Sequence, residues 1–210
     1  FLRFIARSPV GDMIGNFTAD MKAQGNGRLG LEFHLPLNHM GDTKVAGDFD
    51  FLNNQVTVDP DLPPLTQVSG RLQFTEKGMR IQNLGAQMFG APMRLNASTE
   101  GDKVQVNAQG NLSAAGLRRT LGLPVLDHLS GSANWRGSVT VQKKAATLVI
   151  DSNLLGISSS LPAPLNKSAT QSLAFHLEEG ALPPDGAKGK NAPPRQQLKM
   201  SLGKVASALI

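Results

Sequence analysis

Few residues in the sequence have the types and spacing that chemistry requires. Asp48 and Asp50 begin a segment spaced like a calcium-binding loop. However, its sixth position is Asn53 instead of Gly, and its twelfth is Asp59 instead of Glu. A solvated strand face accounts for the two aspartates without a metal. We therefore expect no calcium site in this segment.

Two other patterns could indicate catalysis. Ser201 and Lys204 match Ser-x-x-Lys, but the Ser-Asp-Asn and Lys-Thr-Gly motifs that accompany it in serine acyl-enzymes are missing. Glu178 and Glu179 are adjacent, so on a strand they point to opposite faces and are poorly placed to act as an acid–base pair. We interpret both glutamates as solvated side chains.

Metal and cofactor sites are not indicated either. The chain has no Cys, which excludes thiol nucleophiles and Cys-ligated metals, and its histidines lack ligand spacing. It contains no Gly-x-Ser-x-Gly, phosphate-loop or dinucleotide-binding pattern. We therefore predict a protein that is not an enzyme and uses no cofactor and no metal. The histidines are His34, His39, His128 and His176.

Composition indicates a folded chain without a membrane-spanning helix. Of its 210 residues, 40% are hydrophobic and 18% charged, and no apolar run approaches the roughly 18 residues that a spanning helix needs. The net charge of +5 comes from residues 111–210, which carry 11 basic and 5 acidic side chains. These basic residues form no dense run and base-stacking aromatics are scarce, so we expect no nucleic-acid partner.

The dominant pattern is alternation of apolar and polar residues, which places apolar side chains on one face of a strand. It is clear in residues 29–35, 45–51 and 68–74. Short hairpin turns are expected at Asn53-Asn54, Lys77-Gly78, Gly101-Asp102 and Lys143-Lys144. Further strands are expected at residues 56–58, 79–81, 93–97, 104–108, 133–141, 148–150, 173–177 and 198–202.

Only two segments favour helix. Ser8-Pro9 resembles a helix start and Gly25 a stop, which predicts an amphipathic helix in an N-terminal region, residues 1–24. Ser113 and Gly122 bound a second helix, within a helical insertion at residues 113–129. The remaining region, residues 25–210, is predicted to be β-structure with a flexible Gly/Pro/Lys loop at residues 180–197.

So many strands with an apolar face need something to cover that face. Two sheets packed face to face would do so, and composition alone favours this sandwich. A membrane barrel is not favoured, because the chain has no Tyr and one Trp for its aromatic girdles. A curled sheet whose concave apolar face forms a groove for acyl chains is the third solution.

Two stretches carry a family resemblance. Residues 131–141 (Gly-Ser-Ala-Asn-Trp-Arg-Gly-Ser-Val-Thr-Val) and 148–167 resemble the YhdP-type members of the AsmA-like family. The turn Leu-Pro-Ala-Pro-Leu-Asn-Lys at residues 161–167 is the most specific part. Residues 45–51 and 61–78 also resemble the family's repeated strand pattern, so the similarity extends over nearly the whole chain.

The resemblance implies a fold, a location and a function. It implies a mainly β chain with one long curled antiparallel sheet, a taco-like groove with two short amphipathic helices, as a fragment of a longer repeated β-groove. The protein would lie in the periplasm of a Gram-negative bacterium, anchored in the inner membrane by an N-terminal helix outside this sequence. The groove would bind phospholipids and conduct their acyl chains between inner and outer membranes.

Strand parity alone predicts which residues line the groove, and no residue is predicted to be catalytic or to bind a metal. The alternative is a structural or assembly spacer of the envelope, in which the same side chains form a dry packed core. The predicted lipid-binding residues are Phe33, Phe49, Phe51, Val56, Val58, Leu72, Phe74, Met93, Leu95, Val104, Val106, Trp135, Val139, Val141, Leu148, Ile150, Phe175 and Leu177.

Overall fold

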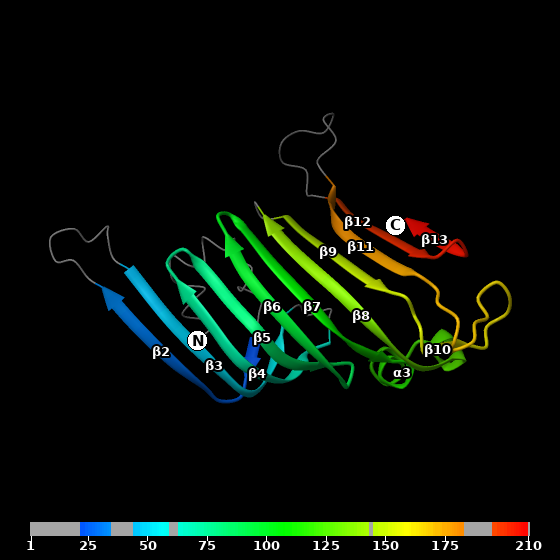
Figure 1. The fold of residues 1–210 in the computed structure, drawn as a ribbon, viewed down its shortest axis with the longest axis horizontal. Helices are drawn as coiled ribbons and strands as arrows, with labels where there is room; N and C mark the ends of the chain where they lie inside the picture. Colours follow the sequence, from blue (N-terminus) through cyan, green and yellow to red (C-terminus); the bar gives the residue numbers. More distant parts are fainter. Residues whose placement is uncertain (1–21, 35–43, 59–62, 143–144, 183–194, 210) are drawn as a thin grey trace. The chain divides into compact units, whose positions relative to one another are not determined.

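Strands dominate the computed structural model, which describes residues 22–34, 44–58, 63–142, 145–182 and 195–209. Within these ranges thirteen strands belong to one sheet (Figure 1). The strands are β1 (Lys22–Gln24), β2 (Gly27–His34), β3 (Lys44–Thr57), β4 (Leu65–Thr75), β5 (Gly78–Met88), β6 (Ala91–Glu100), β7 (Lys103–Ser113), β8 (Leu129–Gln142), β9 (Ala145–Ser152), β10 (Ile157–Ser159), β11 (Phe175–Leu182), β12 (Arg195–Leu202) and β13 (Ala206–Leu209).

The chain divides into two compact units, and β7 contributes residues to both. The first unit contains the described residues up to Ala108 together with Gln142. Its strand order is β1-β3-β4-β5-β6-β7, and β2 also pairs with β3. The second unit contains Gln109–Val141 and the described residues from Ala145 onward. Its order is β7-β8-β9-β11-β12-β13, and β10 pairs with β8.

A short helical segment follows β7 in the second unit. Helix α3 (Ala114–Leu121) begins where the Ser113 hydroxyl accepts a hydrogen bond from the Gly116 amide at 3.0 Å. It ends at Gly122, whose left-handed backbone (φ 62°) lets its amide donate to the Arg118 carbonyl. The 3-10 helix η2 (Pro124–His128) follows. Ser113 and Gly122, the two residues that predicted helix α3, are therefore confirmed as its caps.

The predicted fold class is confirmed, because the described chain is mainly β and forms one large antiparallel sheet. The predicted helix at residues 8–24 lies outside the described residues, except that residues 22–24 form β1. The loop predicted at residues 180–197 is too long at both ends. β11 continues to Leu182 and β12 begins at Arg195, because these ends pair with each other.

The hairpin turn predicted at Asn53-Asn54 is wrong. Both residues lie inside β3, which runs unbroken for 14 residues because β2 pairs with its first part and β1 with its last. Asn53 has φ 61° and is the extra residue of a β-bulge, since Leu52 lies opposite Ser69 and Asn54 opposite Val68. Asn tolerates this left-handed backbone, which is why it also resembles a turn residue.

The bulges preserve the sheet's faces. In β3 the side chains on one face are odd-numbered up to Phe51 and even-numbered from Asn54 onward. In β5 the same change occurs at Asn83 (φ 53°), where Ile81 lies opposite Ala97 and Leu84 lies opposite Leu95. Each extra residue shifts the alternation by one, so apolar side chains on both sides of a bulge stay on the same face.

Asn54 is a polar side chain buried at the β3 bulge, where it is 2% exposed. Its Oδ1 accepts the Leu52 amide at 2.7 Å, and its Nδ2 donates to the Gln24 carbonyl at 3.1 Å. Gly25 leaves room for it, because a Cβ there would lie 2.9 Å from Nδ2. Asn54 therefore joins the bulge to the connection between β1 and β2.

Replacing Asn54 should destabilise the protein. Asn54→Leu leaves the Leu52 amide and the Gln24 carbonyl without their partner, and we expect a loss of about 1–3 kcal/mol in the free energy of unfolding. Urea denaturation measures this. The control is Gln55→Ala at the adjacent exposed position, which should change stability by less than about 0.5 kcal/mol. Equal effects of the two substitutions would contradict the role given to Asn54.

Lys167 has the corresponding role in the second unit. It is the last residue of the Leu-Pro-Ala-Pro-Leu-Asn-Lys turn and is 8% exposed. Its Nζ donates hydrogen bonds to three backbone carbonyls, and burial lowers its pKa. Its backbone also pairs with Ser159 of β10. The three carbonyl acceptors belong to Leu154, Ile157 and Ser168.

We expect Lys167→Met to destabilise the second unit. The substitution keeps most of the side-chain volume but removes the donor from three carbonyls, which should cost about 3 kcal/mol of unfolding free energy. Thermal unfolding and amide exchange near β10 would report it. Lys199→Met is the control, because Lys199 is exposed and makes only a 3.7 Å surface ion pair with Glu178. Similar melting temperatures for both variants would show that Lys167 is dispensable.

Candidate functional site

Cross-strand register in the first unit places apolar side chains of successive strands side by side. Directly opposite residues of an antiparallel pair lie on the same face. One row of such pairs runs from β2 to β6 through Leu29, Phe49, Leu72, Ile81 and Ala97. We call the face that carries it the first-unit apolar face. A second row on the same face consists of Leu31, Gly47, Phe74 and Met79. Beyond the β5 bulge the face continues through the pairs Leu84–Leu95 and Ala86–Met93.

The predicted lipid-binding residues of this unit differ in burial. Phe74 is 3% exposed, whereas Phe33 on β2 is 52% exposed. β2 is paired on one side only in the described chain, so its apolar side chains lie at an edge. The buried predicted residues are Leu72, Phe74, Met93, Leu95 and Val104, and the partly buried ones are Phe49, Phe51, Val56, Val58 and Val106.

Sequence reasoning missed several residues of this face. Val68, Leu84 and Ala86 are buried and lie on it, but were not predicted as site residues. The bulge at Asn83 is the reason for two of them, because it reverses the parity of β5 between Ile81 and Leu84. An Asn within an otherwise alternating strand was the one available signal, and it equally indicates a turn.

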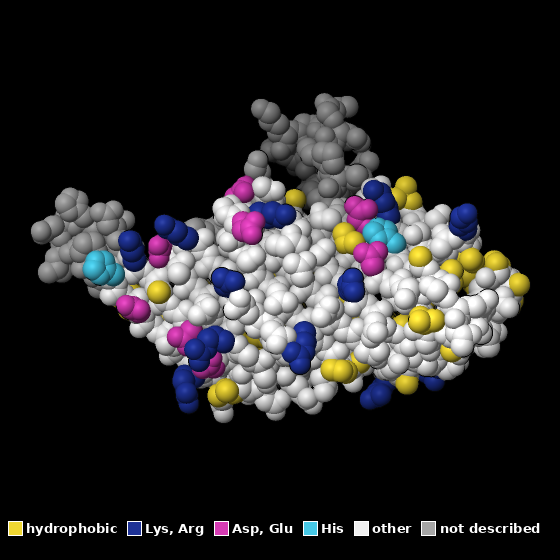
Figure 2. Space-filling model, in the orientation of Figure 1, with side chains coloured by type: hydrophobic (Ala, Val, Ile, Leu, Met, Phe, Trp, Pro, Cys, Tyr) yellow, Lys and Arg dark blue, Asp and Glu magenta, His cyan; other side chains and the backbone are white. Residues whose placement is uncertain are grey.

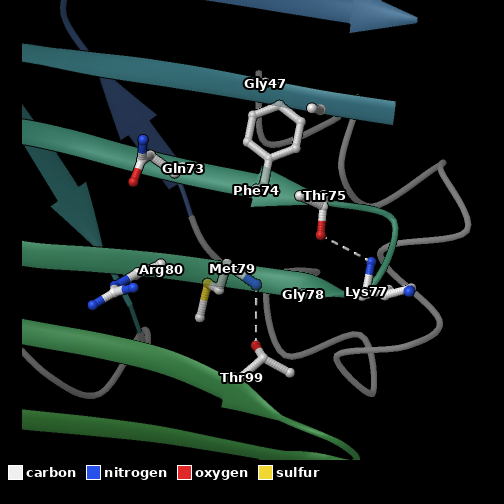
Figure 3. Close-up of a pocket in the computed structure, with 10 residues that line it drawn as sticks. Gly47, Gln73, Phe74, Thr75, Lys77, Gly78, Met79, Arg80 and Thr99 are labelled. Carbon is white, nitrogen blue, oxygen red and sulfur yellow. Dashed lines mark hydrogen bonds between the residues drawn. The ribbon is translucent and has the colours of Figure 1, made fainter. Parts of the chain in front are cut away.

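Glycines let phenylalanine rings lie against the sheet. A Cβ on Gly47 would lie 2.5 Å from Cζ of Phe74, so the ring occupies the space above the glycine (Figure 3). A Cβ on Gly27 would come even closer to the Phe49 ring. These pairs place aromatic surface where a side chain would otherwise project, which flattens the apolar face.

The opposite face of the same strands is polar. Asp50 lies between Arg28 and Arg71, and Arg71 Nε donates to its carboxylate at 2.6 Å. This hydrogen bond from Arg71 lowers the pKa of Asp50 and raises that of Arg71. Figure 2 shows charged side chains distributed over β2–β6, with few hydrophobic ones between them. The two faces therefore differ strongly in polarity.

The second unit has an apolar face of its own. Ile150, Leu177 and Met200 lie opposite one another on β9, β11 and β12, and Phe175 lies opposite Leu202. On the other face His176 Nδ1 lies 2.7 Å from Asp151 Oδ1. Among the predicted residues Trp135 and Val141 are buried, and Val139, Leu148, Ile150, Phe175 and Leu177 are partly buried.

Glu179 is an acidic residue on the apolar face of the second unit, because it lies on the same side of β11 as Leu177. It lies opposite Leu148 on β9 and Leu198 on β12, whereas Glu178 points to the other face and pairs with Lys199. The prediction that the two glutamates lie on opposite faces is confirmed. Because they are separated by the sheet, they form no acid–base pair.

A cavity of about 430 Å³ lies at the turn between β4 and β5 in the first unit. Gly47, Phe74 and Met79 give it an apolar wall that continues the first-unit apolar face. Polar residues of the turn and of the neighbouring strands line the rest of the cavity (Figure 3). These are Gln73, Thr75, Lys77, Arg80 and Thr99.

Two kinds of feature are missing from the described ranges. They contain no group of three or more His, Asp or Glu residues that could hold a metal ion. They also contain no helix with the length and hydropathy needed to cross a bilayer. The first unit does form an extended apolar face backed by a polar one.

The fold and its apolar faces define a class of protein, the antiparallel β-sheet proteins with a continuous apolar face. Sequence comparison identifies the family within it. The family described as YhdP protein matches residues 1–205, so the chain belongs to the YhdP family. The predicted family resemblance is confirmed.

A relative at 32% identity is the intermembrane phospholipid transporter YhdP of Escherichia coli (strain K12), matched over 187 residues. The match covers 83% of this chain but only 14% of that relative. The chain therefore spans a small part of the relative's length. No solved structure matches the chain.

The glycine–phenylalanine contact gives a test of the first-unit apolar face. Gly47→Ala places a Cβ about where the Phe74 ring lies, so we expect a loss of about 1–3 kcal/mol in unfolding free energy. Gly85→Ala is the matched control, because its Cβ would have only one neighbour within 4 Å, the Ser69 carbonyl at 3.8 Å, and we expect a change below about 1 kcal/mol. Denaturant unfolding compares them. If Gly47→Ala were as stable as Gly85→Ala, the ring would not lie over Gly47.

Proposed function

We propose that the apolar faces of this chain hold phospholipid acyl chains and form part of a conduit along which phospholipids pass between the inner and outer membranes. The observation that carries the proposal is the continuity of the first-unit apolar face. Cross-strand pairs extend it from β2 to β6 without a charged residue, and the bulges keep it on one side. The proposed ligand contacts are the predicted site residues together with Val68, Leu84 and Ala86.

The energetics favour acyl chains as ligands. Each methylene that leaves water gains about 0.8 kcal/mol, so partial burial of two tails retains a lipid whose headgroup stays in water. Neighbouring positions on the face offer similar contacts, since Phe49 and Leu72 are followed by Phe74 and Met79 in the next row. A lipid can therefore move between positions without losing all of its contacts at once. Such movement requires no reaction, and we propose that the protein is not an enzyme.

The named relative supports the same function. It is an intermembrane phospholipid transporter, and this chain matches 14% of it. We infer that the chain serves as one segment of a longer protein in the periplasm of a Gram-negative bacterium. In that protein an N-terminal helix outside this sequence provides the inner-membrane anchor. Phospholipids are the proposed partners, and no nucleic acid is expected.

A second function is supported by the burial of the face. Val68 and Phe74 are only 2% and 3% exposed, which is typical of a packed core. An envelope spacer with a dry interior would use these side chains for stability alone. The two functions differ in whether the purified protein contains lipid.

The test is a pair of charge substitutions on opposite faces. Phe49→Glu places a carboxylate on the first-unit apolar face and should lower co-purifying phospholipid severalfold, whereas Gln82→Glu, at an exposed position on the polar face of β5, should leave it unchanged. Phe33→Glu tests the exposed edge of the face with little risk to folding. Lipid mass spectrometry gives the ratio of lipid to protein, and thermal unfolding is measured for each variant.

Each outcome discriminates between the two functions. Loss of lipid in the apolar-face variants alone, at retained folding, supports the conduit. Equal loss from both faces at unchanged stability would refute the assignment of the face. A wild-type protein that contains no phospholipid and is well packed would favour the spacer.

A further inference from the structure

We propose that the cavity at the β4–β5 turn binds the phosphate group of a phospholipid whose acyl chains lie on the first-unit apolar face. The inference rests on the proposed function and adds a headgroup site to it. The cavity combines an apolar wall with a cation and two hydroxyl groups within one hairpin turn and its neighbouring strand. That combination matches an amphiphile with an anionic head.

The apolar wall of the cavity continues into the first-unit apolar face. Phe74 and Met79 lie directly opposite each other on β4 and β5, and the Phe74 ring lies over Gly47 on β3 (Figure 3). In the next row along the strands, Phe49, Leu72 and Ile81 follow on the same face. A chain attached to a group in the cavity therefore has a continuous apolar path leading away from the turn.

Two threonine hydroxyls at the turn are left able to donate hydrogen bonds. The Thr75 Oγ1 accepts the Lys77 amide at 3.1 Å, and the Thr99 Oγ1 accepts the Met79 amide at 3.2 Å. Each contact uses an oxygen lone pair and fixes the hydroxyl in place, but leaves its proton for another acceptor. Within the described chain neither proton has a hydrogen-bond acceptor. Thr99 lies on the apolar face with Ala97, whereas Thr75 lies on the polar face with Gln73, so Thr99 is the hydroxyl that we assign to the phosphate, whose oxygens accept hydrogen bonds.

Lys77 supplies the positive charge. It is exposed at the turn and forms no ion pair with another described residue. Its neighbour Glu76 is directed toward β3, where its carboxylate accepts the Val45 amide at 3.3 Å. Arg80 also borders the cavity, but it lies opposite Gln73 on the polar face, since Met79 occupies the apolar one. Lys77 is therefore the cation that we assign to the phosphate.

The experiment compares lipids that differ only in the phosphate. Binding of fluorescent phosphatidylglycerol and of diacylglycerol with the same acyl chains is measured on the 210-residue chain. We expect the wild type to prefer phosphatidylglycerol, and Lys77→Gln to lower that preference about threefold to tenfold with diacylglycerol binding unchanged. Lys103→Gln is the matched control, because Lys103 follows the β6–β7 turn of the same unit but does not line the cavity. It should retain the wild-type preference.

Thr99 provides a second pair of variants. Thr99→Val removes the hydroxyl at nearly constant volume and should also lower the preference, whereas Thr99→Ser should keep it. Thermal unfolding of each variant separates loss of binding from loss of folding. If Thr99→Val destabilises the chain, the comparison of Lys77→Gln with Lys103→Gln alone tests the headgroup site, because Lys77 is an exposed turn residue whose replacement should not affect folding.

The outcomes separate this inference from the proposed function. Unchanged preference in Lys77→Gln, with both lipids still bound, overturns the headgroup site and leaves the acyl-chain face intact. Failure of the wild type to bind either lipid overturns both. Free phosphate is tested alone by nuclear magnetic resonance. If it shifts the Lys77 and Thr99 signals at lower concentration than phosphatidylglycerol does, the site takes inorganic phosphate and the lipid assignment is wrong.

Discussion

Antiparallel pairing between neighbouring strands is the constraint on which the rest of this structure depends. Residues that lie directly opposite must share a face, so the register of each pair decides whether apolar side chains form a continuous surface or scattered patches. Phe49 is the clearest case, because it lies between Leu29 and Leu72 in register. A slip of one residue in β3 would place Asp48 or Asp50 in that row, and the burial of a carboxylate disfavours this register.

The bulges and buried polar groups protect that register. Asn54 bonds the Leu52 amide before the β3 bulge and the Gln24 carbonyl at the end of β1, so the irregularity is tied to the neighbouring strand. Lys167 does the same for the irregular turn of the second unit, where its ammonium group replaces the strand partners that three carbonyls lack. In both units a polar side chain stabilises the place where regular pairing stops.

The proposed function depends on the apolar face that this strand register produces. The first-unit apolar face carries no charged residue from strand to strand. Its chemical specificity must then come from the ends of strands, where turns bring polar groups next to the apolar surface. The β4–β5 turn has this arrangement in the first unit, with Lys77 and Thr99 beside Phe74 and Met79. In the two proposals, acyl chains and headgroup are bound by different parts of one hairpin.

The sequence by itself determined that the chain is mainly β, the caps of α3 and most of the apolar residues, because alternation and capping are local properties of the chain. Alternation left a sandwich and a single curled sheet both open, and the family resemblance favoured the single sheet. The sequence also identified the family, through residues 131–141 and 148–167. Only the tertiary structure decided that Asn53 continues β3 and that Leu84 and Ala86 join Ile81 on one face. A bulge residue and a turn residue have the same left-handed backbone, and the partner strand alone distinguishes them. Lys77 and Thr99 are 22 positions apart in the sequence, and they line one cavity because β5 pairs with β6.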